Sequence, residues 1–285
     1  MNDDNEKQGR IWFVTGAARG LGRELVTAAL RHGDSVVAAV RNTQRLDRSA
    51  PFDDDRVLVT TLDVTDEAQA LQAIEAALER FGRIDVVVNN AGHGLLGAVE
   101  ETTAQQVRGL LATNVEGVLN VTRAVLPVLR AQGSGHLINI SSLGGFASSP
   151  GNGVYGATKF AVEGLSEALA GELEPLGIKV TIVEPGFFRT DFLSGQSIAL
   201  ADRRIADYEM TIDRERVLER HGQQPGDPRK AADAIVELVG SEHPPLRLPL
   251  GADAVERISG KLERVRAELD TWRDLSLSTG FVLQT

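Results

Sequence analysis

The 285-residue chain contains no cysteine. Without thiols it can form no disulfide, no zinc–thiolate site and no cysteine nucleophile. A chain without disulfides suits a reducing compartment, so we expect a cytoplasmic protein. The N-terminal residues MNDDNEKQGR hold no apolar signal-peptide core, and we expect 1–10 to be a disordered tail. No apolar run approaches the roughly 20 residues that a membrane span requires, so we expect none.

Positive charge is also scarce, since 30 Lys and Arg residues stand against 40 Asp and Glu residues. The formal net charge of -10 argues against nucleic acid or an anionic membrane surface as the main partner. Hydrophobic residues make up 42% of the chain and charged residues 25%, which is typical of a globular protein with an ample core.

The chain does contain a regular alternation of apolar runs and helical patterns. Short runs rich in Val, Ile and Leu predict strands at 11–16, 35–40, 56–64, 84–92, 135–142 and 178–186. Apolar residues at helical spacing predict helices between them at 21–33, 66–82, 114–130 and 154–176. Strands that are apolar on both faces are typical of a parallel sheet covered by helices on both sides. Right-handed crossovers then predict a single α/β domain with a doubly wound parallel sheet.

The alternation changes after Gly186. Residues 190–228 are charged, weakly periodic and too long for a simple connection, so we expect a partly helical substrate loop or lid. A helix at 229–241 and an edge strand at 244–251, where proline is tolerated, complete the sheet. The expected organisation is a tail at 1–10, one domain at 11–250 with the loop at 190–228, and a C-terminal helix and tail at 251–285 packed on the same domain.

A glycine-rich turn, TGAARGLG at 15–22, joins the first expected strand to the first expected helix. Gly16, Gly20 and Gly22 permit a tight turn and a close approach of a pyrophosphate to the backbone, and the helix N-terminus supplies N–H groups. A tight turn without a ligand is the alternative. Because the turn opens the first β-α-β unit, we expect a dinucleotide site.

The end of the second expected strand favours NADP(H) over NAD(H). A NAD site usually has an acidic residue there for the ribose 2′-OH, whereas this chain has Val40 followed by Arg41. Arg19 lies within the glycine-rich turn, and two guanidinium groups suit a 2′-phosphate. Alternatively, both arginines are solvated surface residues. Asp63, at the end of the third expected strand, either meets the adenine or starts the following helix.

Tyr155 and Lys159 lie four residues apart in a chain with only two tyrosines and five lysines. Chance gives such a pair in roughly 4% of cases, and the spacing places both side chains on one helix face. We expect the ammonium to lower the tyrosine pKa from its free value of ~10 and to prepare the phenol for proton transfer. Ser142 ends the fifth expected strand, where ligands bind in open parallel sheets, and we expect its hydroxyl to bond a substrate oxygen.

These motifs together resemble the short-chain dehydrogenase/reductase family. They are TGAARGLG (15–22), NNAG (89–92), Asn114, INISS with Ser142, YGATK (155–159) and PGFFRT (185–190), and they follow in the family's order over residues 10–191. The resemblance implies a single Rossmann-type domain with a seven-stranded parallel sheet. It also implies NAD(P)-linked interconversion of carbonyls and alcohols, and a homodimer or homotetramer packed through the helices at 114–130 and 154–176.

The resemblance implies roles for the matching residues. Tyr155 would be the general acid in reduction, Ser142 would fix the carbonyl, Lys159 would hold the nicotinamide ribose and tune the tyrosine, and Asn114 would anchor a water that leads to Lys159. Phe188 stands where the family usually has an aliphatic residue, which leaves a backbone contact possible. The expected cofactor-binding residues are Gly16, Arg19, Gly20, Leu21, Gly22, Arg41, Asp63, Val64, Asn90, Ala91, Gly92, Tyr155, Lys159, Pro185, Gly186, Phe188 and Thr190.

Residues 92–101 and 141–170 resemble 17β-hydroxysteroid and retinol dehydrogenase-like members, which implies a hydrophobic ketone or secondary alcohol as substrate. Pocket candidates flank the motifs, and the alternative for them is an ordinary core position: His93, Leu143, Phe146, Phe187, Phe192 and Leu193. Two other functions are weighed. A non-catalytic dinucleotide sensor has no need for Ser142, Tyr155 and Lys159 together. Sugar-nucleotide epimerases and dehydratases resemble a larger subclass with a different glycine spacing.

Overall fold

The computed structural model describes residues 9–46, 49, 51–195 and 197–281. The predicted tail at 1–10 lies outside them except for Gly9 and Arg10, and the Arg10 N–H already donates a 2.8 Å hydrogen bond to the Asp34 carboxylate. Seven parallel strands form one sheet, which confirms the predicted doubly wound α/β fold. In spatial order the strands are β3 (Val57–Thr61), β2 (Ser35–Val40), β1 (Ile11–Thr15), β4 (Val86–Asn89), β6 (Gly135–Ile140), β7 (Ile178–Pro185) and β9 (Arg247–Leu250).

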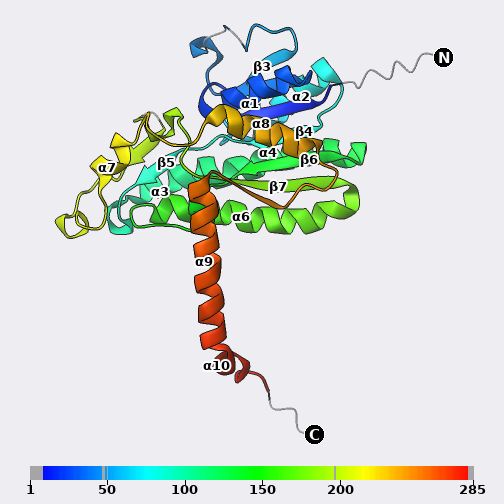
Figure 1. The fold of residues 1–285 in the computed structure, drawn as a ribbon. Helices are drawn as coiled ribbons and strands as arrows, with labels where there is room; N and C mark the ends of the chain where they lie inside the picture. Colours follow the sequence, from blue (N-terminus) through cyan, green and yellow to red (C-terminus); the bar gives the residue numbers. More distant parts are fainter. Residues whose placement is uncertain (1–8, 47–48, 50, 196, 282–285) are drawn as a thin grey trace.

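Helices cover both faces of this sheet (Figure 1). One face packs against α1 (Gly20–Arg31) and α8 (Pro228–Gly240). The other packs against α2 (Glu67–Phe81), α4 (Gly117–Gln132) and α6 (Gly153–Leu173). Because successive strand residues point to opposite faces, each strand supplies side chains to both cores.

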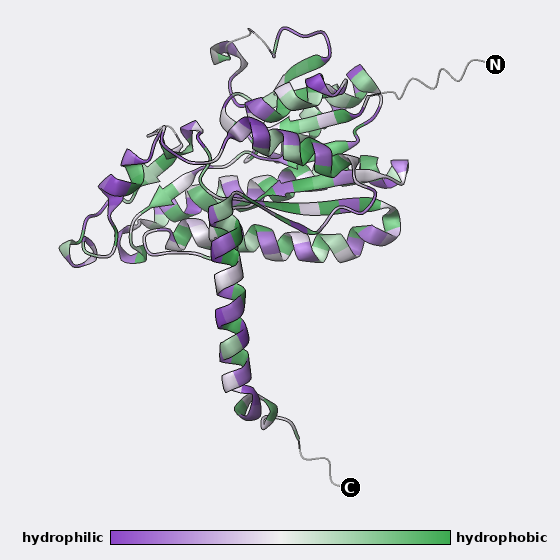
Figure 2. Ribbon diagram, in the orientation of Figure 1, coloured by the Kyte–Doolittle hydropathy of each residue, from purple (hydrophilic) through white to green (hydrophobic). Residues whose placement is uncertain are grey.

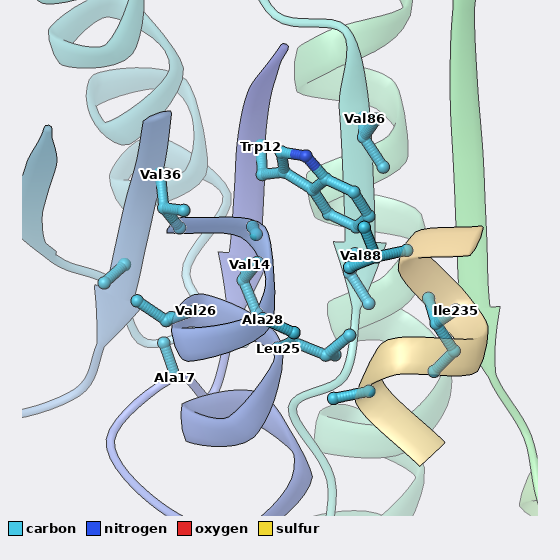
Figure 3. Close-up of a cluster of buried hydrophobic side chains, with 14 of the residues drawn as sticks. Trp12, Val14, Ala17, Leu25, Val26, Ala28, Val36, Val86, Val88 and Ile235 are labelled. Atoms are coloured by element: carbon cyan, nitrogen blue, oxygen red, sulfur yellow. The ribbon is translucent and has the colours of Figure 1, made fainter. Parts of the chain in front are cut away.

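Residues Trp12 and Phe13 of β1 show this division. Both are fully buried, but Trp12 belongs to the α1/α8 core and Phe13 to the opposite core. Figure 3 shows Trp12 packed among Val88, Leu25 of α1 and Ile235 of α8. The indole N–H donates a 2.7 Å hydrogen bond to Asp34, so the buried polar atom of the tryptophan is satisfied.

The helix predicted at 114–130 begins ten residues earlier than expected. Thr103 accepts a hydrogen bond from the Gln106 N–H and caps α3 (Ala104–Leu111), and a π-helical turn (Ala112–Glu116) then leads into α4. A π turn changes the direction of the side chains that it carries and often occurs at functional sites. Here it carries Asn114.

The predicted loop at 190–228 contains regular structure. It includes β8 (Ile198–Leu200), α7 (Arg214–Glu219) and the 3-10 turns Asp191–Leu193 and Ala206–Tyr208. Strand β8 pairs in parallel with β5 (Gly94–Leu96), so the segment is fastened to the chain just beyond β4. An apolar cluster joins the segment to residues of and just after β5; its members are Leu96, Ala98, Leu193, Ile198 and Ile212.

The C-terminal helix α9 (Ala252–Thr271) leaves the body of the domain as a straight arm and is followed by the short helix α10 (Arg273–Leu277) (Figure 1). Only Ala254 and Ile258 of α9 are buried, and every residue from Leu262 to Phe281 is exposed. We expected a helix and tail at 251–285 to pack on the domain. In the structure the first turns of α9 do so, the described residues beyond them are exposed, and 282–285 lie outside the described ranges. No helix within the described ranges has the length and apolar content needed to cross a bilayer.

Candidate active site

The four predicted catalytic residues lie together at the carboxyl end of the sheet. Ser142 follows β6, Tyr155 and Lys159 lie in the first turns of α6, and Asn114 comes from the π turn. The Ser142 hydroxyl lies near enough to the Tyr155 phenol to act on its pKa. A Cβ placed on Gly92 would lie 3.1 Å from the Asn114 Oδ1 and 3.7 Å from the Lys159 Nζ, so these two polar groups face the same space.

Ser142 is held by its local structure. It is the N-cap of the short helix α5 (Leu143–Phe146), and its Oγ accepts a 3.1 Å hydrogen bond from the Gly144 N–H. A Cβ at Gly144 would lie 3.5 Å from the Ser142 Oγ and 3.8 Å from the Tyr155 ring, so the missing side chain keeps the space beside both hydroxyl groups open. The glycines after Ser142 therefore serve the site as well as the turn.

The pKa of Tyr155 differs from our expectation. Burial raises it to about 12, although the Ser142 hydroxyl acts in the opposite direction. The Lys159 ammonium lies 6.0 Å from the centre of the tyrosine ring, so its charge does not outweigh the loss of water around the phenol. Tyr155 is therefore a protonated donor throughout the neutral range.

Lys159 is itself a perturbed group. Burial lowers its pKa to about 8, while the nearby Glu163 acts to raise it. Its Nζ donates a 2.8 Å hydrogen bond to the backbone carbonyl of Ile140, at the end of β6. The side chain is thus fixed between the strand that leads to Ser142 and the helix that carries Tyr155.

A buried pair of carboxyl groups lies behind Lys159, and the sequence analysis missed it. Glu163 and Glu184 are both buried, and each has a carboxylate oxygen without a hydrogen-bond partner among the described residues. Burial first, and then the charge of Glu163, raise the pKa of Glu184 to about 7. The Arg247 Nε lies 3.1 Å from Glu163 and 3.5 Å from Glu184, and it offsets part of the repulsion. Glu163 lies on α6 and Glu184 on β7, so the two are not close in sequence and no local pattern indicates that they approach one another.

Asn114 binds backbone and side-chain groups around the site. Its Nδ2 donates to the His93 carbonyl at 2.9 Å and to the Thr158 hydroxyl at 3.1 Å, and its Oδ1 accepts from the His93 N–H at 3.1 Å. The buried amide thus joins the loop after β4 to α6. The expected link from Asn114 through a water to Lys159 stays a prediction.

The glycine-rich turn fits a dinucleotide pyrophosphate. Gly16 has φ +64°, and a Cβ there would lie 3.0 Å from the Ala91 Cα. A Cβ on Gly22 would lie 2.5 Å from the Gly16 carbonyl oxygen. Asn90 links the loop after β4 to the glycine-rich turn, since its Nδ2 donates a 2.8 Å hydrogen bond to the Thr15 carbonyl. No side chain of a described residue caps α1, so its first N–H groups suit an anion.

The loop after β7 approaches the same turn. The Thr190 Cβ would lie 3.5 Å from a Cβ on Gly20, which brings two predicted cofactor residues together. Asp253, in the first turn of α9, accepts a 2.8 Å hydrogen bond from the Phe187 N–H. A pocket of ≈ 310 Å³ opens beside this loop and is lined by Gly20, Glu24, Arg189, Thr190, Asp191, His221, Gly222 and Pro228.

The residues predicted around the adenosine are distributed over three strand ends. Arg41 is exposed directly after β2, and Arg19 is the N-cap residue of α1. The Asp63 Oδ1 accepts hydrogen bonds from Thr65, while Asp66 caps α2, so Asp63 is not the residue that starts this helix. The remaining predicted cofactor residues are packed: Leu21 against the α1/α8 core, Val64 against Gly117, Pro185 and Gly186 at the end of β7, and Phe188 against Gly226 and Gly251.

Three of the predicted substrate residues lie beside the catalytic groups. The Phe192 ring is 5.8 Å from the Tyr155 ring, Leu143 is buried next to Ser142, and the backbone of His93 is bound by Asn114. Together with Leu95 and Leu110, Tyr155 and Phe192 form an apolar cluster at the site. This wall suits an apolar substrate.

The other three pocket candidates have different surroundings. The Phe146 ring lies beneath the side chains of Arg247 and Lys261, each 5.9 Å from its centre, so it packs at the base of α9 and not beside Tyr155. Arg220 lies 5.3 Å above the Phe187 ring. Leu193 is buried in the apolar cluster of the 190–228 segment. The assignment of Phe146 as a substrate contact stays a prediction.

Glu101 fastens the 190–228 segment and was not identified from the sequence. Its fully buried carboxylate accepts hydrogen bonds from the Ile205 and Ala98 N–H groups, both 2.8 Å, and is paired with Arg214. Burial acts to raise its pKa, but these hydrogen bonds and the guanidinium lower it to about 2. Glu101 thus holds the segment in place through its charge. The sequence shows only an acidic residue at position 101, which does not by itself indicate this role.

A doubly wound sheet with a glycine-rich first turn and a Ser–Tyr–Lys site at its carboxyl edge defines a class of dinucleotide-fold oxidoreductases. The short chain dehydrogenase family model matches residues 10–199, and the chain belongs to this family.

Individual relatives agree with this membership. The chain is 41% identical over 274 residues to oxidoreductase BOA17 of Botryotinia fuckeliana, which covers 95% of this chain and 99% of that one. It is 37% identical over 245 residues to a 3-ketodihydrosphingosine reductase of Bacteroides thetaiotaomicron, covering 86% and 88%. The crystal structure of a short-chain dehydrogenase from Streptomyces avermitilis superposes with a TM-score of 0.89 at 44% identity, covering 96% of this chain and 100% of that one.

Two further solved structures carry nicotinamide nucleotides. ElxO with NADP bound has a TM-score of 0.73 at 26% identity and covers 87% of this chain and 99% of that chain. A 3-ketoacyl-(acyl-carrier-protein) reductase from Brucella melitensis, complexed with NADH, has a TM-score of 0.72 at 25% identity and covers 85% and 97%. Relatives of this fold thus bind either nucleotide.

Proposed function

We propose that this protein is an NADP(H)-dependent oxidoreductase that interconverts a hydrophobic ketone and a secondary alcohol. The observation that carries the proposal is the placement of Ser142, Tyr155 and Lys159 together at the carboxyl edge of the sheet, close to the glycine-rich turn. A sensor that only binds a nucleotide does not need this set of three groups, so we place the non-catalytic alternative second.

Each residue has a role that follows from its contacts. The Ser142 hydroxyl donates to the substrate oxygen and fixes it beside the phenol. Tyr155, with its pKa raised to about 12 by burial, holds its proton at neutral pH and gives it to the same oxygen in reduction. Lys159 is tied to Ile140 and presents its ammonium to the ribose side of the site. The nicotinamide, when bound, supplies or accepts the hydride.

The cofactor would be held by the glycine-rich turn and by the loop after β7. Gly16 and Gly22 leave the backbone accessible, the N-terminus of α1 meets the pyrophosphate, and Thr190 approaches from the opposite side. Arg41 and Arg19 support a preference for NADP(H), because their guanidinium groups suit a 2′-phosphate. The end of β2, Val40 followed by Arg41, offers no carboxylate for the ribose 2′-OH of NAD.

The apolar wall formed by Leu95, Leu110 and Phe192 supports a hydrophobic ketone, as expected from the resemblance to hydroxysteroid and retinol dehydrogenase-like proteins. Two of the similar proteins are named as reductases of 3-keto compounds, which agrees with a ketone as the substrate class. We further propose that the enzyme is a cytoplasmic homo-oligomer.

The test is turnover of a panel of apolar ketones, followed by the absorbance of NADPH. Tyr155→Phe should lower kcat by about 100-fold or more, since general acid catalysis contributes roughly 10²–10⁴, and should leave NADPH binding by fluorescence or calorimetry unchanged. Tyr208→Phe is the matched control, because the second tyrosine bonds Glu100 at the surface. Full activity in Tyr155→Phe would refute the mechanism, and NADPH binding without turnover of any ketone would favour the sensor.

A further inference from the structure

The base of α9 packs against two loops that flank the active site. Asp253, Arg257 and Lys261 lie on one face of the helix at steps of one turn, and each is half-buried. Ala254 and Ile258 are buried beside them and fix this face to the domain. Figure 2 shows hydrophilic and hydrophobic residues interleaved along α9. The packed face of the helix is thus polar as well as apolar, and its polar groups bind specific partners on the domain.

Asp253 binds the loop after β7, which we call the β7 loop (residues 186–190). Its Oδ2 accepts the 2.8 Å hydrogen bond from the Phe187 N–H. The carboxylate lies between two glycines: a Cβ on Gly186 would collide with it, and a Cβ on Gly251, where φ is +94°, would lie 2.7 Å from its Oδ1. The chain therefore leaves a fitted space for this carboxylate beside the β7 loop.

Arg257 binds the loop between β6 and α6, which we call the β6–α6 loop (residues 141–152). Its Nη2 donates a 2.9 Å hydrogen bond to the Ala147 carbonyl, at the end of the short helix α5. A basic side chain can satisfy a carbonyl at the C-terminus of a helix in this way. The loop contains three glycines and four serines, and glycine restricts the backbone least. A contact from outside the loop therefore has a large effect on its position.

The two loops carry different parts of the site. Ser142 lies in the β6–α6 loop and Tyr155 follows it, whereas Thr190 of the β7 loop approaches the glycine-rich turn. Lys261 extends the contact to α6, since its Nζ lies 4.8 Å from the centre of the Phe160 ring. One helix thus contacts the elements that, under the proposed function, hold the substrate carbonyl and the nicotinamide nucleotide.

We propose that Asp253 and Arg257 are positioning residues, which fix the β7 loop and the β6–α6 loop relative to one another and so align the carbonyl with the nicotinamide. This role rests on the proposed function. Both residues act through the backbone, Asp253 through Phe187 and Arg257 through Ala147. They project from adjacent turns of one helix, whose hydrogen-bonded backbone keeps their spacing constant. A misplacement of about 1 Å can lower a rate by about 100-fold, so this spacing matters for catalysis.

Two alanine variants separate the contributions of the two contacts. Arg257→Ala should lower kcat for a ketone by about 10- to 100-fold and leave the Kd of NADPH unchanged, because Arg257 binds only the loop that carries Ser142. Asp253→Ala should raise the Kd of NADPH by about 10-fold, because the nucleotide must then order the β7 loop itself. Asp253→Asn keeps an acceptor for the Phe187 N–H and Arg257→Lys keeps a donor, so each should restore most of the loss.

Amide hydrogen exchange measures the same contacts in the protein without nucleotide or substrate. Asp253→Ala should speed exchange at Phe187, whose N–H loses its acceptor, and leave Gly145 and Ala147 unchanged. Arg257→Ala should speed exchange at Gly145 and Ala147, whose N–H groups bond within the turn of α5, and leave Phe187 unchanged. A general loss of stability would speed exchange at all three positions in both variants.

Arg264→Ala and Glu256→Ala are the matched controls, since both residues are exposed on α9, and they should change neither kinetics nor exchange. Wild-type kcat in Arg257→Ala, or equal losses of kcat and NADPH affinity in both alanine variants, would overturn the positioning role. A wild type that turns over no ketone would instead refute the proposed function. In that case unchanged exchange in Asp253→Ala and Arg257→Ala would still show that neither contact holds its loop.

Discussion

The Lys159 ammonium donates a 2.8 Å hydrogen bond to the carbonyl of Ile140. This bond joins the first turns of α6 to the last residue of β6, and Ser142 follows two residues later. Tyr155, one turn before Lys159, lies near enough to Ser142 for that hydroxyl to act on the phenol pKa. The four residues thus form a closed connection between one strand end and one helix, which fixes the relative positions of the two hydroxyl groups.

The titration of Lys159 predicts the pH dependence of cofactor use. Its pKa is lowered to about 8 by burial, while that of Tyr155 lies at about 12. Between these values Lys159 loses its charge and the phenol keeps its proton, so kcat/KM for NADPH, which reports the free enzyme, should fall as the pH rises above about 8. Lys159→Arg keeps the charge and should remove this fall. A similar fall in the Lys159→Arg profile would assign the titration to another group.

Substitution of Arg41 tests the preference for NADP(H). Arg41→Ala should weaken NADPH binding by about 10- to 100-fold, since hydrogen bonds to charged groups contribute roughly 1.5–3 kcal/mol, and should change NADH binding little. Calorimetric titration with both nucleotides measures the difference. The control is Arg130→Ala, an exposed arginine at the end of α4. An equal loss for both nucleotides would show that Arg41 does not recognise the 2′-phosphate.

The buried Glu101 should control the stability of the 190–228 segment. Glu101→Ala leaves Arg214 without its partner in a buried position, which costs on the order of 3–5 kcal/mol. We expect faster amide exchange at Ile205 and earlier proteolysis within the segment, and we expect Glu79→Ala, exposed on α2, to change neither.

The pKa of Glu101 gives the sign of the related pH effect. It is lowered from 4.5 to about 2, so the stabilisation is fully present above about 4.5 and is lost as the pH falls toward 2. In acid, amide exchange and proteolysis of the wild-type segment should therefore rise toward the values that Glu101→Ala shows at neutral pH. An acid-induced loosening that is equally large in Glu101→Ala would contradict this assignment.

Glu184 should have the opposite pH dependence. Its pKa in the folded protein is raised to about 7, so the folded state holds the proton more tightly than the unfolded chain. The free energy of unfolding then falls as the pH rises from about 4.5 through 7. Glu184→Gln should flatten this slope and stabilise the protein by about 1–3 kcal/mol at pH values above about 8. Urea unfolding at several pH values measures it, with Glu167→Gln, whose carboxylate contacts Arg247 at the surface, as control. A slope that persists in Glu184→Gln would implicate another buried group.

The sheet, and the position of Tyr155 and Lys159 on one helix, were predictable because their signals are local. Each strand is a continuous apolar run, and the Tyr155–Lys159 spacing already places both side chains on one helix face. The β5–β8 pair was not predictable in the same way, because each strand has three residues and the partners lie about 100 positions apart. The Glu163–Glu184 contact likewise depends on the packing of α6 against β7, which no short pattern encodes.

Burial explains the remaining differences. From the sequence, Lys159 was expected to lower the pKa of Tyr155, but the loss of water around the phenol has the larger effect in the structure. The sequence predicted a C-terminal helix within 251–285, and the structure has α9 there. The sequence could not show whether the apolar face of this helix packs on its own domain, because helix contacts within a chain and between chains have the same periodicity.

The fastening of the 190–228 segment has a consequence for engineering and divergence. The segment is held by the β5–β8 ladder and by Glu101, whereas Ser142, Tyr155, Lys159 and Asn114 all lie on other elements. A graft that keeps the register of Gly94–Leu96 with Ile198–Leu200 can thus exchange Phe192 and the rest of the segment, while Tyr155, Leu95 and Leu110 stay in place. Under the proposed function, the segment that carries Phe192 and the residues that carry the proton transfer are separate stretches of this chain, so each can be changed by recombination without the other.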